Sequence, residues 1–354
     1  MNDTALIAQL ANDVFERHCS RDVVAAAEGG WSAELWRALE ESGLTRVGVS
    51  EASGGSGGGW DEAAAVLRVA ARYAAPVPLA ETTVLAGWLL DSAGIALPAG
   101  ALTQGIGAIE SDGRVLRGRI ARVPWARESA GIVVVARRGE SQNIFVVPPE
   151  RCRIERGTNI AREPRDTVIF DGVPLDGLAS AKLEHTGTHA RGAMVRAIQM
   201  AGALERVLEL TVEYVKVRRQ FGRALAEFQA VQQELALLAG ESAAATASVE
   251  NALAALRATG QSPIRAVSSC RVEIAAAKIR AGAAATEGAR IAHQLHGAIG
   301  VTHEHELHHL TSRLWSWREE YDGEQSWAIW LGKELAAAGG QGTWDLLTKR
   351  EVAA

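Results

Sequence analysis

The sequence predicts a mostly helical α+β fold, and three observations support this prediction. Apolar residues recur at helical spacing before residue 98 and after residue 186, whereas short segments rich in valine and isoleucine fill the stretch between them. No repeated βαβ unit is present, which argues against a parallel nucleotide-binding sheet. We therefore expect a helical region at 1–98, a small antiparallel β domain at 99–185 and a four-helix bundle at 186–354.

The first region is predicted to be helical because Leu6, Leu10 and Val14 follow the steps of an apolar helix face. Prolines at positions 76, 78 and 98 interrupt this pattern. The glycine-rich run at 54–59 resembles a phosphate-binding loop, but no Lys-Ser or Lys-Thr pair follows it. A turn between two helices is therefore the favoured interpretation of this run.

The middle region is predicted to consist of strands separated by turns. Asp112-Gly113 is typical of a tight hairpin turn, and 139–143 predicts a looser one. Strands joined by such turns pair antiparallel, so a small sheet or barrel is expected. Four strands are expected, at 114–123, 131–136, 144–147 and 167–170.

The last region returns to helical spacing. One long apolar stripe includes Met194, Ile198 and Val215, which predicts a long helix with one buried face. Gly339-Gly340 is expected to stop the last helix. Further helices are expected at about 225–259, 263–295, 307–317 and 325–338.

The charge balance limits the kind of ligand that the protein can bind. The net charge is −5, from 37 basic and 42 acidic residues, which gives no overall attraction for nucleic acid or an anionic membrane. A small molecule held by a few local arginines and helix N-termini fits better. The three cysteines are far apart, the first residues lack the features of a secretory signal, and no run is apolar for long enough to span a membrane. We expect a cytoplasmic protein.

One short segment matches a zinc motif. His305-Glu306-Leu307-His308-His309 fits the H-E-x-x-H pattern of zinc peptidases, in which His305 and His309 would share one helix face. A solvated helix start explains the same residues, so we expect no bound metal. A zinc peptidase is the third functional hypothesis.

Two other segments carry a stronger signal. Arg218-Arg219-Gln220-Phe221-Gly222 follows the long helix and leads into Phe228-Gln229-Ala230-Val231-Gln232. Its arginine, amide and aromatic groups suit a pyrophosphate and a flat ring. Gln294-Leu295-His296-Gly297-Ala298-Ile299-Gly300 places two glycines after another helix, where the backbone can approach a ligand closely. Taken alone, each segment could also be a helix C-cap.

Together, the two segments resemble the acyl-CoA dehydrogenase family, whose patterns read R-x-Q-F-G followed by F-Q-x-x-Q, and Q-x-x-G-x-x-G. Residues 44–57 are similar to that family's P-E-x-x-G-G-x-G loop, with serine in place of proline. The resemblance covers most of the chain and implies FAD as the cofactor. It implies that Arg218, Gln220 and Phe221 contact the pyrophosphate and adenine side of FAD. Gln294 and Gly297 would reach the FAD of a neighbouring subunit, so an oligomer is expected.

The resemblance also implies a carboxylate that removes the α-proton of an acyl-CoA thioester while the β-hydrogen passes to the flavin as hydride. Tyr321-Asp322-Gly323 resembles the family's Y-E-G loop with aspartate for glutamate, which makes Asp322 the candidate base. Glu320 is the alternative. The other position that the family uses for its base falls near Ala193, which cannot act as one.

The middle region departs from the family pattern. No counterpart of the T-E-P-G-A-G-S-D-like stretch precedes the first expected strand, and Trp125 packs either on the flavin ring or in the core. Such losses resemble the short bacterial subunits that pair with a related subunit, as in steroid side-chain breakdown. The leading hypothesis is a FAD-dependent acyl-CoA dehydrogenase, a homo-oligomer or a heterotetramer with a related subunit, that passes electrons to a separate acceptor. The alternative is a non-catalytic subunit of such a complex.

Overall fold

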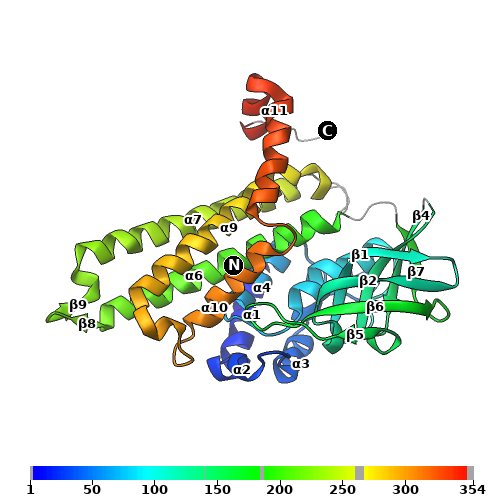
Figure 1. Ribbon diagram of the computed structural model, residues 1–354, viewed down its shortest axis with the longest axis horizontal. Coiled ribbons are helices and arrows are strands. Elements are labelled where there is room, and N and C mark those ends of the chain that lie inside the picture. The colour runs from blue at the N-terminus through cyan, green and yellow to red at the C-terminus, as the bar shows by residue number, and fades with distance from the viewer. Residues whose placement is uncertain (1–2, 140, 184–186, 260–266, 349–354) are drawn as a thin grey trace. The chain divides into compact units, whose positions relative to one another are not determined.

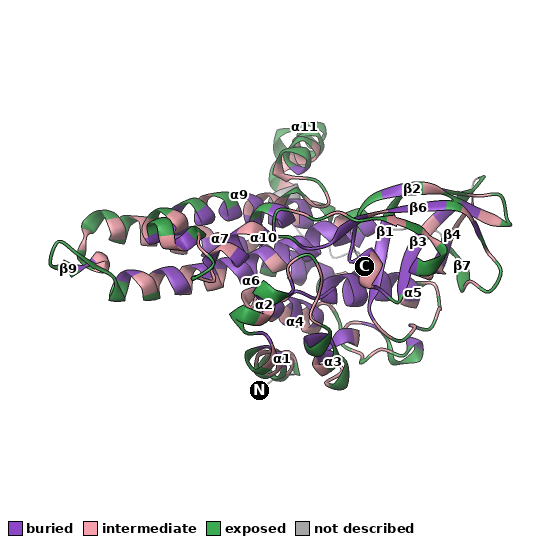
Figure 2. Ribbon diagram, turned by 60° about the horizontal axis from the view of Figure 1, so that its bottom comes forward, coloured by how far each residue is buried: buried purple, intermediate pink, exposed green. Residues whose placement is uncertain are grey.

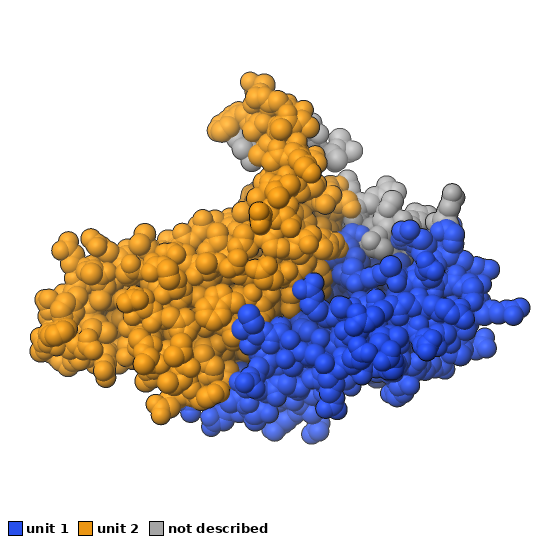
Figure 3. All heavy atoms as spheres, viewed as in Figure 1, with its two compact units in different colours: residues 1–67, 75–188 blue, residues 68–74, 189–354 orange. Residues whose placement is uncertain are grey.

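A computed structural model describes residues 3–139, 141–183, 187–259 and 267–348 of the chain (Figure 1). The chain forms two compact units (Figure 3). One contains residues 1–67 and 75–188, and the other contains residues 68–74 and 189–354. Among the described helices, none combines the length and the apolar character that crossing a membrane would require.

The first unit opens with helices, as the apolar spacing predicts. The hydroxyls of Ser20 and Ser32 accept hydrogen bonds from the Val23 and Leu35 amides, which caps two of these helices at their N-termini. The helices are α1 (Asp3–His18), α2 (Arg21–Ala26), α3 (Ala33–Glu41), α4 (Trp60–Arg72), a π-helical segment (Glu81–Gly87) and α5 (Trp88–Ser92), of which α4 continues into the second unit.

The glycine-rich run forms a closed turn rather than a phosphate cradle. The Gly57 amide donates to the Val49 carbonyl at 2.9 Å, and the Gly48 amide donates to the Gly57 carbonyl at 2.8 Å. A Cβ on Gly55 would lie 2.1 Å from the Val49 carbonyl oxygen, so only glycine fits there. Because these amides bond within the loop, they are not available to a phosphate.

One seven-stranded sheet forms the rest of the first unit, in the order β5-β6-β2-β1-β3-β4-β7. The predicted turn at Asp112-Gly113 is confirmed. Hydrogen bonds from the Val115 and Arg114 amides lower the pKa of Asp112 to about 2. The strands are β1 (Leu102–Ser111), β2 (Val115–Pro124), β3 (Gly131–Arg138), β4 (Ser141–Val147), β5 (Arg153–Glu155), β6 (Arg165–Pro174) and β7 (Ser180–Leu183).

The sheet is mixed, so the prediction of an antiparallel sheet was wrong for one pair. β1 pairs parallel with β3, and the other pairings among these described strands are antiparallel. β3 lies on the edge of β1 that β2 does not occupy, and it runs in the same direction as β1. The four predicted strands correspond to β2, β3, β4 and β6. β1 was missed because its Gly105 and Gly107 resemble turn residues, and β5 and β7 are short.

The second unit is a helical bundle, which confirms the predicted fold class. α9 packs against α7, α10 and α11, and the four long helices α6, α7, α9 and α10 lie alongside one another with their facing sides buried (Figure 2). Its elements are α6 (Thr188–Val217), β8 (Arg219–Gln220), β9 (Arg223–Ala224), α7 (Gln229–Ala258), α9 (Arg271–His296), α10 (Leu307–Glu319) and α11 (Glu324–Thr348).

The predicted stripe on α6 is the core of this unit. Met194, Ile198 and Val215 are at most 1% exposed. Gly202 lies where the end of α4 crosses α6, and a Cβ there would be 2.3 Å from the Arg68 carbonyl oxygen. The residue type at this crossing is therefore fixed by the close approach of two backbones.

α11 breaks where the sequence predicts, but it does not stop there. Gly339 has φ 70° and ψ 176°, and the helix resumes after it as far as Thr348. Trp327 is buried, whereas Ile329 and Trp344 further along are 54% and 63% exposed. The first residues of the helix predicted from 263 lie outside the described residues.

Candidate functional site

The R-x-Q-F-G segment forms a hairpin turn after α6, in which β8 pairs with β9. Phe221 and Gly222 at the turn have positive φ values of 51° and 81°. The turn places Arg218 and Gln220 at the end of α6. The Phe221 side chain is 92% exposed, and its ring meets Phe228 edge to face with 6.3 Å between centroids.

The Q-x-x-G-x-x-G segment forms the C-terminal end of α9 and the turn after it. Gly297 has φ 64°, and a Cβ there would meet no described atom within 4 Å. The backbone at Gly297 is therefore open to a ligand. Gly300 has a different role. It allows close packing against His296, because a Cβ on it would lie 2.9 Å from the His296 Cβ.

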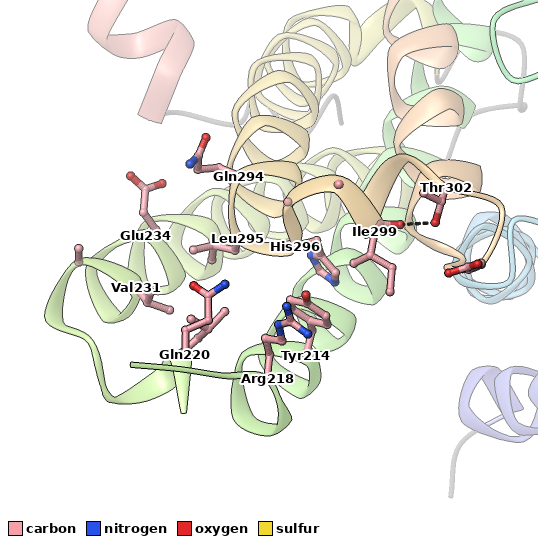
Figure 4. A pocket seen from close by; sticks show the side chains of 15 residues that line it. Tyr214, Arg218, Gln220, Val231, Glu234, Gln294, Leu295, His296, Ile299 and Thr302 are labelled. Atoms are coloured by element: carbon pink, nitrogen blue, oxygen red, sulfur yellow. Dashed lines mark hydrogen bonds between the residues drawn. The ribbon is translucent and has the colours of Figure 1, made fainter. Parts of the chain in front are cut away.

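The two segments line one pocket of about 860 Å³ in the second unit (Figure 4). Arg218 and Gln220 come from the end of α6 and the turn, while Gln294 and Gly297 come from the end of α9. The structure thus brings together four of the five residues predicted to bind the cofactor. Phe221 does not line this pocket.

An aromatic cluster forms part of the wall of this pocket. Tyr214 lies one turn before Arg218 on α6, and its ring stacks on His296 with 4.5 Å between centroids. His305 meets the same imidazole edge to face at 4.7 Å. Burial lowers the pKa of His296 to about 4, so this imidazole is neutral at physiological pH.

Two acidic side chains, Glu234 and Glu304, line the pocket together with several hydrogen-bond donors. The Glu234 carboxylate pairs at 3.1 Å with Arg290, which also binds Glu287. Arg218 supplies a cation, and Gln220 and Gln294 supply amide donors. This set of donors fits a pyrophosphate joined to sugar and base groups.

The loop that holds Asp322 has an unusual backbone. Tyr321 and Asp322 are consecutive non-glycine residues with positive φ values of 56° and 68°. Such conformations are costly and persist only where neighbouring groups enforce them. Trp327 enforces this one, because its indole Nε1 donates to the Tyr321 carbonyl at 2.9 Å. Gly192 on α6 does so too, since a Cβ there would lie 2.2 Å from the Tyr321 ring.

The two candidate bases in this loop differ in their partners. Glu320 accepts hydrogen bonds from the guanidinium of Arg196 at 2.7 Å, and Arg196 is 1% exposed. Asp322 lies 2.7 Å from His189 Nε2, and the side chains of Asp322 and His189 are 56% and 46% exposed. The Glu320 carboxylate therefore fixes the loop to α6 through Arg196. The Asp322 carboxylate is accessible, and the His189 imidazole orients it. Of the two carboxylates, Asp322 is the one that a substrate could reach in this chain.

A buried lysine anchors the same loop from α9. Lys278 is fully buried, and its ammonium donates to the Trp317 and Arg318 carbonyls at 3.1 Å and 2.6 Å. It thereby satisfies carbonyls at the C-terminal end of α10. Burial lowers the pKa of Lys278 to about 8, although Glu320 and Glu324 oppose this shift.

The buried lysine makes stability depend on pH in a predictable direction. Because Lys278 has a lower pKa in the folded protein than in the unfolded chain, the unfolded chain binds more protons between about pH 8 and pH 10. The free energy of unfolding should rise with pH in this window, by on the order of 3 kcal/mol from this group. Denaturant titrations across this pH range should show that the free energy of unfolding of wild type rises relative to that of Lys278→Met. A pH-independent difference would contradict the assignment.

The zinc motif does not form the helical arrangement that a zinc peptidase requires. α10 begins at Leu307, so His305 and Glu306 precede the helix while His309 lies inside it. The Glu306 carboxylate pairs with Arg206 at 2.7 Å. Within the described residues, His305 and His309 do not come together in any group of three potential metal ligands.

Sequence reasoning missed several residues that surround the two sites. Tyr214 could have been found from helical spacing, because it lies four residues before Arg218. His189, Arg196 and Lys278 carry no local signal, since they reach Asp322 and its loop from other helices. Trp125 is a core residue: it is 3% exposed, and its indole donates to the Gly30 carbonyl at 3.3 Å.

Comparison with known families agrees with this architecture. A family model described as the acyl-CoA dehydrogenase N-terminal domain matches residues 2–95, and one described as the acyl-CoA dehydrogenase C-terminal domain matches residues 185–318. The chain belongs to the acyl-CoA dehydrogenase family. Acyl-CoA dehydrogenase IpdE2 of Mycobacterium tuberculosis is 34% identical to it over 288 residues, which cover 80% of each chain.

Solved structures of acyl-CoA dehydrogenases share the fold. A chain of the ChsE4-ChsE5 complex from Mycobacterium tuberculosis matches with a TM-score of 0.84 and 22% identity, over 95% of this chain and 98% of that one. A variant of the Tcur3481-Tcur3483 steroid ACAD matches with a TM-score of 0.83 and 24% identity over the same shares. At these identities the likeness establishes the acyl-CoA dehydrogenase fold alone.

Proposed function

We propose that this chain takes part in the FAD-dependent α,β-dehydrogenation of an acyl-CoA thioester as a subunit of an oligomer. The observation that carries this proposal is the single pocket lined by Arg218, Gln220, Gln294 and Gly297. Family membership supports acyl-CoA dehydrogenation in general. FAD, when bound, supplies the acceptor for the hydride that leaves the β-carbon.

The pocket is proposed to hold the ADP part of the cofactor. Arg218 would pair with the pyrophosphate, and Gln220, Gln294 and the open backbone at Gly297 would contact the sugar and the base. The resemblance assigned these two segments to FAD molecules of different subunits. Because they line one pocket of one chain, we infer that they hold the same molecule.

The pocket and the candidate base lie far apart within the second unit. Lys278 anchors the Asp322 loop, and His296 at the pocket lies five turns further along α9, about 27 Å away. A cofactor whose ADP part lies in this pocket would have to span this distance to place its flavin ring beside Asp322 of the same chain. We infer that a cofactor held in this pocket reacts in a neighbouring subunit, and that Asp322 acts on a substrate beside a cofactor held by another chain.

Asp322 is the proposed base. Its carboxylate would take the α-proton, while His189 orients the carboxylate through the contact of 2.7 Å. The Asp322 side chain is 56% exposed in the single chain, whereas a general base acts best in a dry site. We therefore propose that substrate and a neighbouring subunit cover this loop in the assembled enzyme.

The neighbouring subunit is proposed to be a related acyl-CoA dehydrogenase chain. Exposed apolar side chains on α11, such as Ile329 and Trp344, are typical of a surface that another chain covers. The ChsE4-ChsE5 structure is that of a complex, and the similar Tcur3481-Tcur3483 protein is described as a steroid ACAD. In its more specific form, the proposal is that this chain and a related subunit together act on the acyl-CoA derivative of a steroid. The electrons then pass to a separate acceptor.

The second candidate is a non-catalytic subunit of such a complex. The exposure of Asp322 is the observation that favours it, because a chain that lacks a working base can still contribute the pocket at the end of α9. Purification of the chain alone and with its native companion tests both candidates. Turnover by the isolated chain would exclude the second candidate, and a protein without flavin in both preparations would overturn the proposed function.

Arg218→Ala should weaken FAD retention about tenfold or more, because a charge-assisted hydrogen bond to phosphate contributes roughly 1–3 kcal/mol. The measurement is the flavin-to-protein ratio after gel filtration. Arg219→Ala is the matched control, since Arg219 carries the same charge one residue away and does not line the pocket. Equal flavin content in both variants would remove the pocket from the cofactor site.

A further inference from the structure

The pocket at the ends of α6 and α9 has more negative than positive charge on its wall. Among the described residues that line it, Arg218 is the one arginine or lysine, whereas Glu234 and Glu304 are acidic. The histidine of the lining, His296, is neutral at physiological pH, because burial lowers its pKa to about 4. One cation and two carboxylates therefore face a ligand in this pocket.

The cation and the carboxylate of Glu234 come from different helices. Arg218 follows α6, whereas Glu234 lies in the second turn of α7, and Figure 4 shows Gln220 between their side chains. Within the described residues, no carboxylate pairs with the Arg218 guanidinium, so this cation is available to a phosphate. The pocket therefore has a positive side at Arg218 and a negative side at Glu234.

The charge of Glu234 is only partly compensated. Its carboxylate pairs at 3.1 Å with Arg290, but the same guanidinium pairs with Glu287 at 2.7 Å. One cation shared by two carboxylates leaves one negative charge over. The Glu234 side chain is 31% exposed, so a ligand in the pocket can approach it. A phosphate group close to this carboxylate would be repelled.

We propose that Glu234 makes this pocket select the ADP part of FAD against the 3′-phosphorylated ADP of coenzyme A. The proposal rests on the proposed function, in which the pocket holds the ADP part of FAD and the substrate is an acyl-CoA. Both ligands carry a pyrophosphate, which Arg218 compensates. Only coenzyme A carries a phosphate on the ribose, and this group meets the uncompensated charge of Glu234. The substrate is thereby kept out of the cofactor site.

The test uses two ligands that differ only in the 3′-phosphate. Coenzyme A and 3′-dephospho-coenzyme A are titrated as competitors of FAD on the full chain, purified together with its companion subunit if one is present, and released flavin is measured by fluorescence. In wild type, coenzyme A should compete about three- to tenfold more weakly than the dephospho compound. This ratio should fall towards one in Glu234→Gln, which keeps the size of the side chain. It should also fall at high salt, because ions screen the repulsion.

Glu213→Gln is the matched control, because Glu213 is exposed near the end of α6 and does not line the pocket. It should leave the ratio at the wild-type value. If Glu234→Gln also keeps the wild-type ratio while Arg218→Ala still weakens FAD retention, the role of Glu234 is overturned and the cofactor pocket stands. An equal fall in both glutamine variants would overturn it too, since a general charge effect would then explain the ratio. If neither compound nor ADP releases flavin, the assignment of the pocket fails as well.

Discussion

Asp322→Asn is expected to lower the rate of flavin reduction by an acyl-CoA about 10²- to 10⁴-fold, the usual contribution of a general base. The asparagine keeps the size of the side chain and can still accept a hydrogen bond from His189. It cannot take the α-proton. The loop geometry and the flavin content should therefore be unchanged, and the effect should appear in stopped-flow measurements of flavin absorbance.

Glu319→Gln is the control for this experiment. Glu319 belongs to the same acidic segment, but its side chain is 62% exposed, and its ion pair with Arg318 at 3.1 Å is of the surface kind that contributes little. Removal of its charge should leave the rate unchanged. If Asp322→Asn and Glu320→Gln both reduce flavin at the wild-type rate in the reconstituted protein, neither carboxylate is the base. The chain is then the non-catalytic half of its complex.

Gly192→Ala is expected to lower the same rate about 100-fold, because catalytic geometry tolerates little displacement. The added Cβ would lie 2.2 Å from the Tyr321 ring, so the ring must move. Tyr321 cannot move alone, since Trp327 holds its carbonyl and the Arg196 guanidinium lies over its ring. Asp322 is the next residue and would be displaced with it.

Two measurements separate this effect from general unfolding. Flavin retention should persist in Gly192→Ala, because Gly192 lies near the start of α6 and the pocket lies at the opposite end of that helix. Overpacking should lower the free energy of unfolding by about 1–3 kcal/mol. Gly240→Ala on α7 is the control: a Cβ there meets no described atom within 4 Å, so the alanine should be neutral or stabilising. Full activity of Gly192→Ala would show that the Tyr321 contact does not position Asp322.

The predictions that succeeded depend on residues close together in the sequence. The stripe through Met194, Ile198 and Val215 is buried as expected, because helical spacing places such residues on one face of α6. The turn at Asp112-Gly113 forms because its hydrogen bonds involve only the next residues. The parallel pairing of β1 with β3 could not be predicted in this way, since these strands are not consecutive in the sequence and no local turn joins them.

The sequence by itself determined the family, the helical and β regions, and the segments that carry Arg218, Gln294 and Asp322. Only the tertiary structure decided that Arg218 and Gln294 line one pocket, that Arg196 binds Glu320, and that His189, 133 positions away, contacts Asp322. The physical reason is that periodicity and motifs report on neighbours along the chain. The partners that orient a base or complete a pocket come from other helices, and the packing of the bundle brings them together.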